Sequence, residues 1–227
     1  MDIRLSYVEK GKGETLILLH GNGESTDYFT NQLDEFSKHF RVIALDTRGH
    51  GNSPRGDGEF TIRRFAEDLK EFMDEKNIDR AHILGFSDGG NIAMCFALKY
   101  PERVDRLILN GANLFPKGVK ASIQAPIVIS YKLCGLISCC SLKARADEEM
   151  LGLMVNDPFI EPSELKKISA KTLVIAGTRD LIKSSHTRLI ARSIDGAELR
   201  FIKGPHAVAA RNPREFNRAV LAFLKKP

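Results

Sequence analysis

Three residues whose types together perform acyl transfer occur along the chain in the order Ser, Asp, His. Ser87 stands at the centre of GFSDG, a G-x-S-x-G pattern, while Asp180 follows AGTR and His206 follows KGP. A serine hydroxyl is a poor nucleophile at neutral pH, so it needs a histidine base. The histidine in turn needs a carboxylate that fixes its tautomer and stabilises the imidazolium. Ser87, His206 and Asp180 are therefore the candidate nucleophile, base and acid.

The surroundings of Ser87 strengthen this prediction. The five-residue pattern is weak by itself, but here it ends an apolar strand predicted over residues 80–86 and opens a helix predicted over 89–100. A sharp strand-to-helix turn needs small residues two before and two after the nucleophile, which the two glycines supply. Such a turn exposes the serine hydroxyl beside the helix N-terminus.

The elements that must position these residues alternate along the chain. Predominantly apolar runs (ILL, VIAL, HILGF, LILN and TLVIA) predict strands buried on both faces, as in a parallel sheet covered by helices. We predict strands at 5–9, 15–20, 41–46, 80–86, 104–110, 171–176 and 197–202, and helices at 27–38, 61–76, 89–100, 184–193 and 213–224. Ligands of such sheets bind beyond the carboxyl ends of the strands, where the three candidates lie.

A second strand end supplies candidate oxyanion donors. The segment after the second predicted strand reads HGNG, whose glycines allow the chain to fold back, so that the backbone N–H of Asn22 can pair with that of Asp88. His20 opens this segment and is interpreted as holding the loop by hydrogen bonds. Asp46 and Arg48, in the Gly-rich loop after the third strand, are interpreted as bracing the same region.

Six segments together resemble the α/β-hydrolase fold superfamily, nearly end to end: HGNGES (20–25), DTRGHGNS (46–53), GFSDGG (85–90), YPERVDRLIL (100–109), AGTRD (176–180) and GPHAVAARNPREF (204–216). The resemblance implies an α/β fold, with a mostly parallel sheet of seven or eight strands, helices on both faces and a small helical cap. It implies Ser87 as nucleophile, Asp180 as acid and His206 as base, with the N–H groups of Asn22 and Asp88 as oxyanion hole. It implies no metal or organic cofactor. Serine as the nucleophile argues against dehalogenases and epoxide hydrolases.

The chain departs from the family pattern at two places, the N-terminal strands and the loop after Asp180. It offers one strand before Thr15 where the family usually has two, which favours seven strands over eight. Some members carry the acid after the strand at 104–110, but Asn110 stands there and cannot serve. The loop after Asp180 reads LIKS, without the proline often found there, so its shape is not predicted. We divide the chain into a hydrolase core (1–111 and 170–227) and a helical cap insertion (112–169).

Asp88 is an unusual neighbour for a nucleophile. A carboxylate beside an oxyanion hole repels anionic intermediates unless it faces away. One interpretation is a carboxylate favoured at a helix N-terminus by the macrodipole. The alternative is a substrate-binding role toward a cationic acyl group such as an α-amino ester, because GFSDGG resembles the valacyclovirase-like (biphenyl-hydrolase-like) branch of the superfamily.

The predicted cap contains an apolar segment, residues 125–142, with a single charge at Lys132. We expect a helix packed over the edge of the sheet, followed by a second helix near 144–155, and a narrow apolar acyl pocket. The alternative is a helix that contacts lipid or a second copy of the chain. Cys134, Cys139 and Cys140 are expected to pack as apolar side chains.

Composition limits the classes of partner. The 227 residues are 43% hydrophobic and 28% charged, which is typical of a globular domain. The net charge of +5 comes from 34 Lys and Arg against 29 Asp and Glu, but no block of five cations occurs, so no nucleic-acid partner is expected. No apolar run reaches the length of a membrane span or a signal peptide. We expect a cytoplasmic monomer or homodimer without stable membrane insertion.

The leading hypothesis is a serine hydrolase that cleaves small carboxylic esters, thioesters or amides through an acyl-serine intermediate. A small-molecule ester, including an amino-acid ester, is the expected partner. Within enzymes, the alternative is a C–C bond hydrolase or a perhydrolase that uses the same residues. In a different class, the alternative is a binding protein that kept the fold without turnover.

Overall fold

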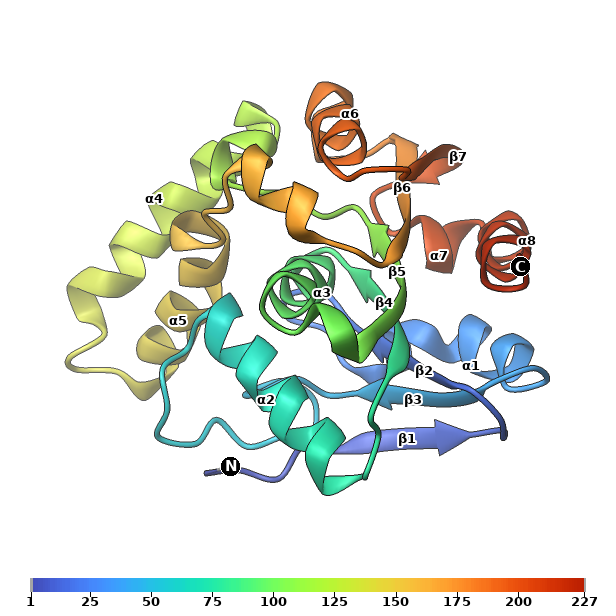
Figure 1. The fold of residues 1–227 in the computed structure, drawn as a ribbon. Helices are drawn as coiled ribbons and strands as arrows, with labels where there is room; N and C mark the ends of the chain where they lie inside the picture. Colours follow the sequence, from blue (N-terminus) through green and yellow to red (C-terminus); the bar gives the residue numbers. More distant parts are fainter. Residues whose placement is uncertain (1, 227) are drawn as a thin grey trace.

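The computed structural model describes residues 2–226, and Figure 1 shows the arrangement of the elements. The strands are β1 (Tyr7–Lys10), β2 (Thr15–Leu19), β3 (Arg41–Leu45), β4 (Ala81–Phe86), β5 (Val104–Asn110), β6 (Lys171–Arg179) and β7 (Glu198–Pro205). The helices are α1 (Thr30–Phe36), α2 (Ile62–Glu75), α3 (Asp88–Lys99), α4 (Ala121–Ile137), α5 (Leu142–Asn156), α6 (Ser184–Ser193), α7 (Val208–Arg211) and α8 (Pro213–Leu224).

The described strands form one seven-stranded sheet in the order β1-β3-β2-β4-β5-β6-β7. β1 pairs with β3 antiparallel, and all other neighbours are parallel. The predicted α/β class, a mostly parallel sheet with helices on both faces, is therefore confirmed, with seven strands. β4 lies at the centre of the order, so the end of β4 is flanked by the ends of β2 and β5.

The apolar strands are buried on both faces because successive side chains point to opposite sides of the sheet. In β2, Ile17 and Leu19 belong to the core under α2, α3 and α6, whereas Leu16 and Leu18 belong to the core under α1, α7 and α8. Figure 1 shows these two groups of helices on either side of the sheet. Both faces of each central strand must therefore be apolar, which explains the uninterrupted runs in the sequence.

β6 and β7 extend beyond their predicted C-terminal ends, and these longer strands determine where Asp180 and His206 lie. β6 continues to Arg179 and β7 to Pro205, because the two strands keep pairing as far as Arg179 and Pro205. Asp180 and His206 therefore each follow directly after a strand. The predicted helix at 27–38 begins instead as a 3₁₀ turn, Thr26–Phe29, before the seven-residue α1.

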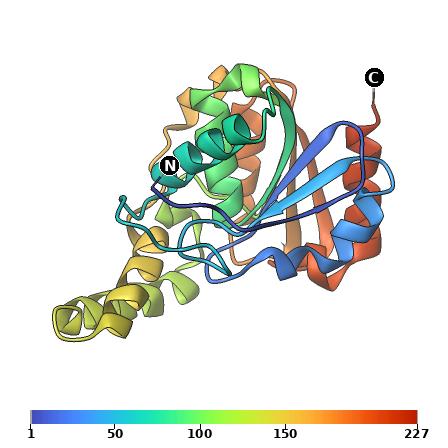
Figure 2. The same ribbon diagram turned by 90° about the horizontal axis from the view of Figure 1, so that it is seen from below.

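The cap differs from the predicted packed helix. α4 and α5 form an antiparallel hairpin that projects beyond the rest of the molecule (Figure 2). α4 has no buried residue, and α5 buries only Ala144 and Leu153. The expectation of a cap helix packed over the sheet is therefore wrong. One side of α4 contacts α5, and no described element covers its other side. Cys139 and Cys140 are also exposed, so their predicted apolar packing is wrong.

A buried arginine joins the loop after β3 to α2. The side chain of Arg48 is fully buried, and its Nε and Nη2 donate to the two carboxylate oxygens of Asp68 at 2.7 Å each. Its Nη1 and Nη2 also donate to Asp2, at 2.8 and 2.6 Å. Asp68 is itself buried, and two cations compensate its charge: Arg48, which binds it bidentately, and Arg64, whose Nη2 lies 2.8 Å from Asp68 Oδ1.

Replacing Arg48 by methionine is expected to lower the free energy of unfolding by about 3–5 kcal/mol, because the variant leaves the Asp68 carboxylate buried without its bidentate partner. Urea denaturation monitored by circular dichroism measures this change. Lys99→Met is the control, because Lys99 forms an exposed ion pair with Glu67 and its removal should change the midpoint little. Equal midpoints for Arg48→Met and the wild type would contradict the argument.

Candidate active site

Ser87 occupies a strained turn between β4 and α3. Its backbone has φ 53° and ψ −119°, a conformation that residues other than glycine rarely adopt. The turn is tight on both sides. A Cβ added at Gly85 would lie 2.1 Å from the carbonyl oxygen of Gly89, and one added at Gly89 would lie 2.1 Å from that of Leu19. The two glycines of the G-x-S-x-G pattern therefore allow the backbone approach that holds Ser87 in place.

A hydrogen-bonded chain links Ser87, His206 and Asp180. The Ser87 Oγ lies 3.0 Å from His206 Nε2, and His206 Nδ1 lies 2.6 Å from Asp180 Oδ1. When Nδ1 carries the proton, it donates to the carboxylate and leaves Nε2 free to accept the serine proton. The structure thus brings together the three residues that were predicted from the ends of β4, β6 and β7.

The carboxylate of Asp180 is buried and held in its ionised form. Its Oδ2 accepts from the backbone N–H of Gly177 at 3.1 Å, and its Oδ1 accepts from that of Ile182 at 2.9 Å. Burial by itself raises the pKa of this carboxyl, but the hydrogen bond and charge of His206 and these two N–H groups outweigh burial, so the pKa is lowered. A charged Asp180 can stabilise a protonated His206.

The two backbone N–H groups predicted as oxyanion donors are without a protein acceptor among the described residues, and both belong to segments next to Ser87. Asp88 is the first residue of α3, where N–H groups have no partner within the helix. Neither its N–H nor that of Asn22 donates a hydrogen bond to another described residue. The loop of Asn22 approaches the turn closely, because a Cβ at Gly21 would lie 3.1 Å from the Ser87 Cβ. Gly23 completes the loop with φ 70°.

The Asp88 side chain faces a buried polar network. Asn22 Nδ2 donates to its Oδ2 at 2.9 Å, and Asn91 Nδ2 donates to its Oδ1 at 3.1 Å. Asn22 Nδ2 also donates to the carbonyl oxygen of Met150 in α5 at 2.8 Å, so the network reaches the cap. Burial raises the pKa of Asp88 to about 6, and the charge of the nearby Asp157 also raises this pKa. The hydrogen bonds from Asn22 and Asn91 and the charge of His206 lower the pKa, but their effect is smaller than that of burial.

His20 has a bracing position. Its Nδ1 lies 2.7 Å from the carbonyl oxygen of Gly21, and its Nε2 accepts from the backbone N–H of Thr47 at 3.0 Å. Burial lowers the pKa of His20 to about 4, so the ring is neutral at pH 7. Asp46 adds a second brace, because its Oδ1 accepts from the N–H of Thr26 at 2.7 Å. These contacts connect the oxyanion loop to the loop after β3.

Several neighbours of the site were not predicted from the sequence. Phe86 stacks on Tyr28 with ring centroids 4.2 Å apart, and its ring lies 4.8 Å from that of His206. Glu24 Oε2 accepts from the N–H of Gly21 at 3.2 Å; burial raises the pKa of this carboxyl, although that N–H and the charge of His206 lower it. Phe86 is the second residue of the G-x-S-x-G pattern, which was the one available signal for its position.

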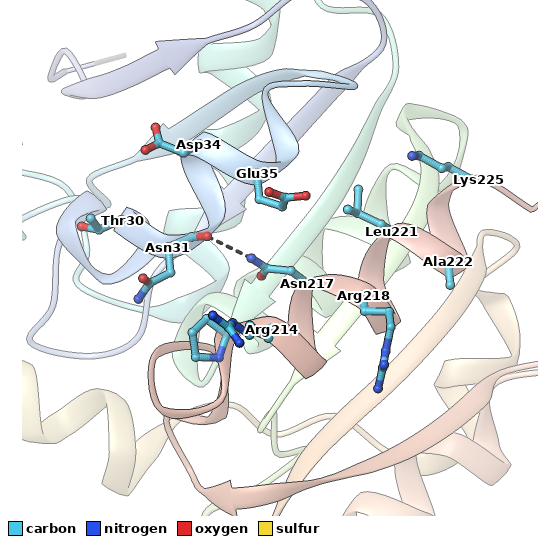
Figure 3. A pocket seen from close by; sticks show the side chains of 11 residues that line it. Thr30, Asn31, Asp34, Glu35, Arg214, Asn217, Arg218, Leu221, Ala222 and Lys225 are labelled. Carbon is cyan, nitrogen blue, oxygen red and sulfur yellow. Dashed lines mark hydrogen bonds between the residues drawn. The ribbon is translucent and has the colours of Figure 1, made fainter.

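A groove elsewhere in the molecule has no connection to this chemistry. It has a volume of about 870 Å³ and lies between α1 and α8, where Asn217 Nδ2 donates to the carbonyl oxygen of Asn31 at 2.9 Å (Figure 3). None of the residues that line it belongs to the Ser87–His206–Asp180 chain. Within residues 2–226, no group of three or more His, Cys, Asp or Glu side chains is arranged to hold a metal ion.

Comparison with known proteins identifies the family to which this fold belongs. The alpha/beta hydrolase fold family matches residues 14–129, just over half of the chain. The "Putative carbamate hydrolase RutD" of Caulobacter sp. (strain K31) is 28% identical, over 93% of this chain and 90% of its own.

Two solved structures are also similar. A hydrolase from Pseudomonas aeruginosa PA01 has 28% identity and a TM-score of 0.81, over 99% of this chain and 95% of that one. A meta-cleavage product hydrolase from Pseudomonas fluorescens IP01 has 26% identity and a TM-score of 0.79, over 98% and 94%. The chain therefore belongs to the alpha/beta hydrolase fold family, and it is a hydrolase of that fold.

The raised pKa of Asp88 predicts a specific pH dependence of stability. Between its ordinary pKa of 3.8 and about 6, the folded protein retains a proton that the unfolded chain has released. The contribution of Asp88 to the free energy of unfolding is therefore fully present below pH 4, and it falls by roughly 2–3 kcal/mol as the pH rises through 6. Denaturation of the wild type and of Asp88→Asn at several pH values measures it.

The quantity to compare is the free energy of unfolding of the wild type minus that of Asp88→Asn at each pH. His20 and His186, whose pKa values burial lowers to about 4, titrate in both proteins and cancel in that difference. The difference should decline between pH 4 and pH 7. A difference that stays constant over this range would show that Asp88 does not titrate there.

Proposed function

We propose that this hydrolase cleaves small carboxylic esters, or thioesters and amides, through an acyl-serine intermediate. The observation that supports the proposal is the chain of two hydrogen bonds, 3.0 Å from Ser87 to His206 and 2.6 Å from His206 to Asp180, at a turn with φ 53°. This combination supplies a nucleophile, a base and an orienting carboxylate at one place.

In the proposed acylation step, Ser87 Oγ attacks the carbonyl carbon while His206 Nε2 takes the hydroxyl proton. The Asp180 carboxylate stabilises the imidazolium that forms. The N–H groups of Asn22 and Asp88 donate to the developing oxyanion. His206 then gives its proton to the leaving group, and the C–O bond of the ester breaks. In deacylation a water molecule, deprotonated by His206, attacks the acyl-serine carbonyl. His206 then returns this proton to Ser87 Oγ as the acyl–oxygen bond breaks, which releases the acid and free Ser87.

Carbon–carbon bond hydrolysis is the second candidate, because the likeness to the Pseudomonas fluorescens meta-cleavage product hydrolase extends over 98% of this chain. The name of the Caulobacter relative refers to a carbamate, whose carbonyl carbon would be attacked in the same way as that of an ester. We favour esters because the arrangement around Ser87 is sufficient for acyl transfer to water. Fold similarity alone does not determine the substrate.

Labelling with a fluorophosphonate probe tests the nucleophile. The wild type should react covalently at Ser87, and Ser87→Ala should lose both the label and hydrolysis of p-nitrophenyl butyrate, with a fall in kcat of at least about 10³-fold. Ser185→Ala is the control, because Ser185 is an exposed serine on α6. A wild type that takes no label would remove the serine hydrolase proposal. Labelling without ester turnover, together with cleavage of a vinylogous diketone, would instead support C–C hydrolysis.

Amino-acid esters are the narrower class that Asp88 suggests. A carboxylate has about four acceptor sites, and Asn22 and Asn91 occupy two of them. If Asp88 also accepts from the ammonium group of an alanyl ester, Asp88→Asn should raise KM for that ester about tenfold and leave KM for the neutral butyrate ester unchanged. Equal effects on both esters would assign Asp88 to positioning Asn22 alone.

A further inference from the structure

The α4–α5 hairpin exposes most of the large apolar side chains on the surface. Among the described residues, eight large hydrophobic side chains are exposed, and six of them lie between residues 123 and 142: Ile123, Ile129, Leu133, Leu136, Ile137 and Leu142. Leu136 and Leu142 are 76% and 87% exposed. A concentration of exposed apolar side chains on one element is typical of a surface that contacts another apolar phase or another protein.

Four of these exposed residues share one face of α4, because the opposite face is occupied by α5. Gln124 Nε2 donates to the carbonyl oxygen of Met154, and Tyr131 OH accepts from Asn156, so these two α4 residues face α5. Gly135, one turn after Tyr131, lies against Glu148 of α5. Ile129, Leu133, Leu136 and Ile137 recur at spacings of three and four on the remaining face. We name these four side chains the apolar face of α4.

The charges around the apolar face are predominantly positive. Residues 121–146, which form α4 and the first part of α5, contain three Lys and Arg and no Asp or Glu. Lys132, Lys143 and Arg145 are exposed, and none of them lies within 4.0 Å of a carboxylate in the part of the chain that the structure describes.

The acids of α5 compensate these cations only in part. Glu149 is bound to Arg55 at 2.7 Å, and Glu148 faces α4. Asp147 remains as an exposed carboxylate, so the exposed charge of the hairpin stays positive.

We propose that the apolar face of α4 docks on an anionic lipid surface. Leu and Ile side chains would enter the boundary between headgroups and acyl chains, while Lys132, Lys143 and Arg145 contact lipid phosphates. Lys132 is exposed beside the apolar face, and its long flexible side chain would extend to the headgroups while the apolar side chains are inserted. No helix among residues 2–226 is long and apolar enough to cross a membrane. In the proposed mode of binding, α4 would lie in the plane of the surface with its apolar face toward the lipid.

A second copy of the chain fits this surface less well. A two-fold contact pairs the same patch on both copies. Lys132 borders the apolar face, three residues after Ile129 and four before Leu136, so a two-fold contact along this face would draw two uncompensated lysines toward apolar surroundings. An anionic surface compensates these charges instead. The charge complementarity therefore favours lipid over self-association.

Docking at α4 would place the active-site loops near the lipid surface. The segment before α4 is joined to the loop of Asp180 by backbone contacts: the N–H of Lys120 donates to the carbonyl oxygen of Leu181 at 2.9 Å, and Val119 pairs with Ile182. The Nζ of Lys120 also donates to the carbonyl oxygen of Asp180 at 2.5 Å. The orientation of α4 is thus linked to the loop that holds the candidate acid.

Vesicle flotation of the full chain tests the proposal. The wild type should float with vesicles made of equal parts of phosphatidylcholine and phosphatidylglycerol, and much less with pure phosphatidylcholine. The partition coefficient of the double variant Leu133→Gln, Leu136→Gln onto the anionic vesicles should be at least about tenfold lower than that of the wild type. The double variant Lys132→Gln, Lys143→Gln should lose binding to the anionic vesicles alone. Unchanged thermal unfolding midpoints verify that both variants are folded.

Val8→Gln is the matched control, because Val8 is an exposed apolar residue on β1, outside the hairpin; its binding should equal that of the wild type. Absence of flotation of the folded wild type, or equal flotation of the leucine double variant, would overturn the proposal. Light scattering measures the oligomeric state and tests the alternative that the apolar face of α4 binds a second copy of the chain. A wild-type dimer that the leucine double variant converts to a monomer, without vesicle binding by either protein, would assign the face to a second copy and would also overturn it.

Discussion

The close backbone contact of β4, β2 and the start of α3, at the end of β4, is the constraint on which the rest of the site depends. The absence of side chains at Gly85 and Gly89 lets α3 start against β2 and β4, and Ser87 is held at φ 53° as a result. The Ser87 N–H donates to the carbonyl oxygen of Asn110 at 2.8 Å, which fixes the turn to β5 as well. A strained residue persists only where its surroundings determine its conformation, and here the central strands do so.

The parallel sheet converts that local constraint into a complete arrangement. β4 carries Ser87, while β6 and β7 are neighbours whose ends present Asp180 and His206. Because all three strands run in the same direction, their carboxyl ends meet at one edge, and side chains that are 93 and 119 residues away from Ser87 reach it. Burial then sets the electrostatics: Asp180 stays charged because His206 and two N–H groups compensate it, whereas Asp88 has only two amide donors, and its pKa is raised.

The sequence predicted the features that follow from periodicity and from glycine. The apolar runs identified the sheet, and the G-x-S-x-G pattern identified the turn. The predicted ends of β6 and β7 were short because Thr178, Lys203 and Pro205 interrupt the apolar pattern, although the backbone pairing continues through them. The contact of Asn22 with Met150 joins residues 128 positions apart, and no local pattern signals it. The apolar character of α4 was evident, but apolar composition does not distinguish a packed helix from an exposed one.

The attachment of the hairpin determines how the cap can affect the site. Since α4 and α5 bury only Ala144 and Leu153, apolar packing contributes little to holding the hairpin on the core. Polar contacts hold it instead: Arg55 with Glu149 at 2.7 Å, and Asn22 Nδ2 with the carbonyl oxygen of Met150 at 2.8 Å. Asn22 Nδ2 is shared between Met150 and Asp88, so a movement of α5 that breaks one bond changes the environment of the Asp88 carboxylate and of the oxyanion loop together. A surface that binds α4 would therefore influence the site through Asn22, without any contact with Ser87.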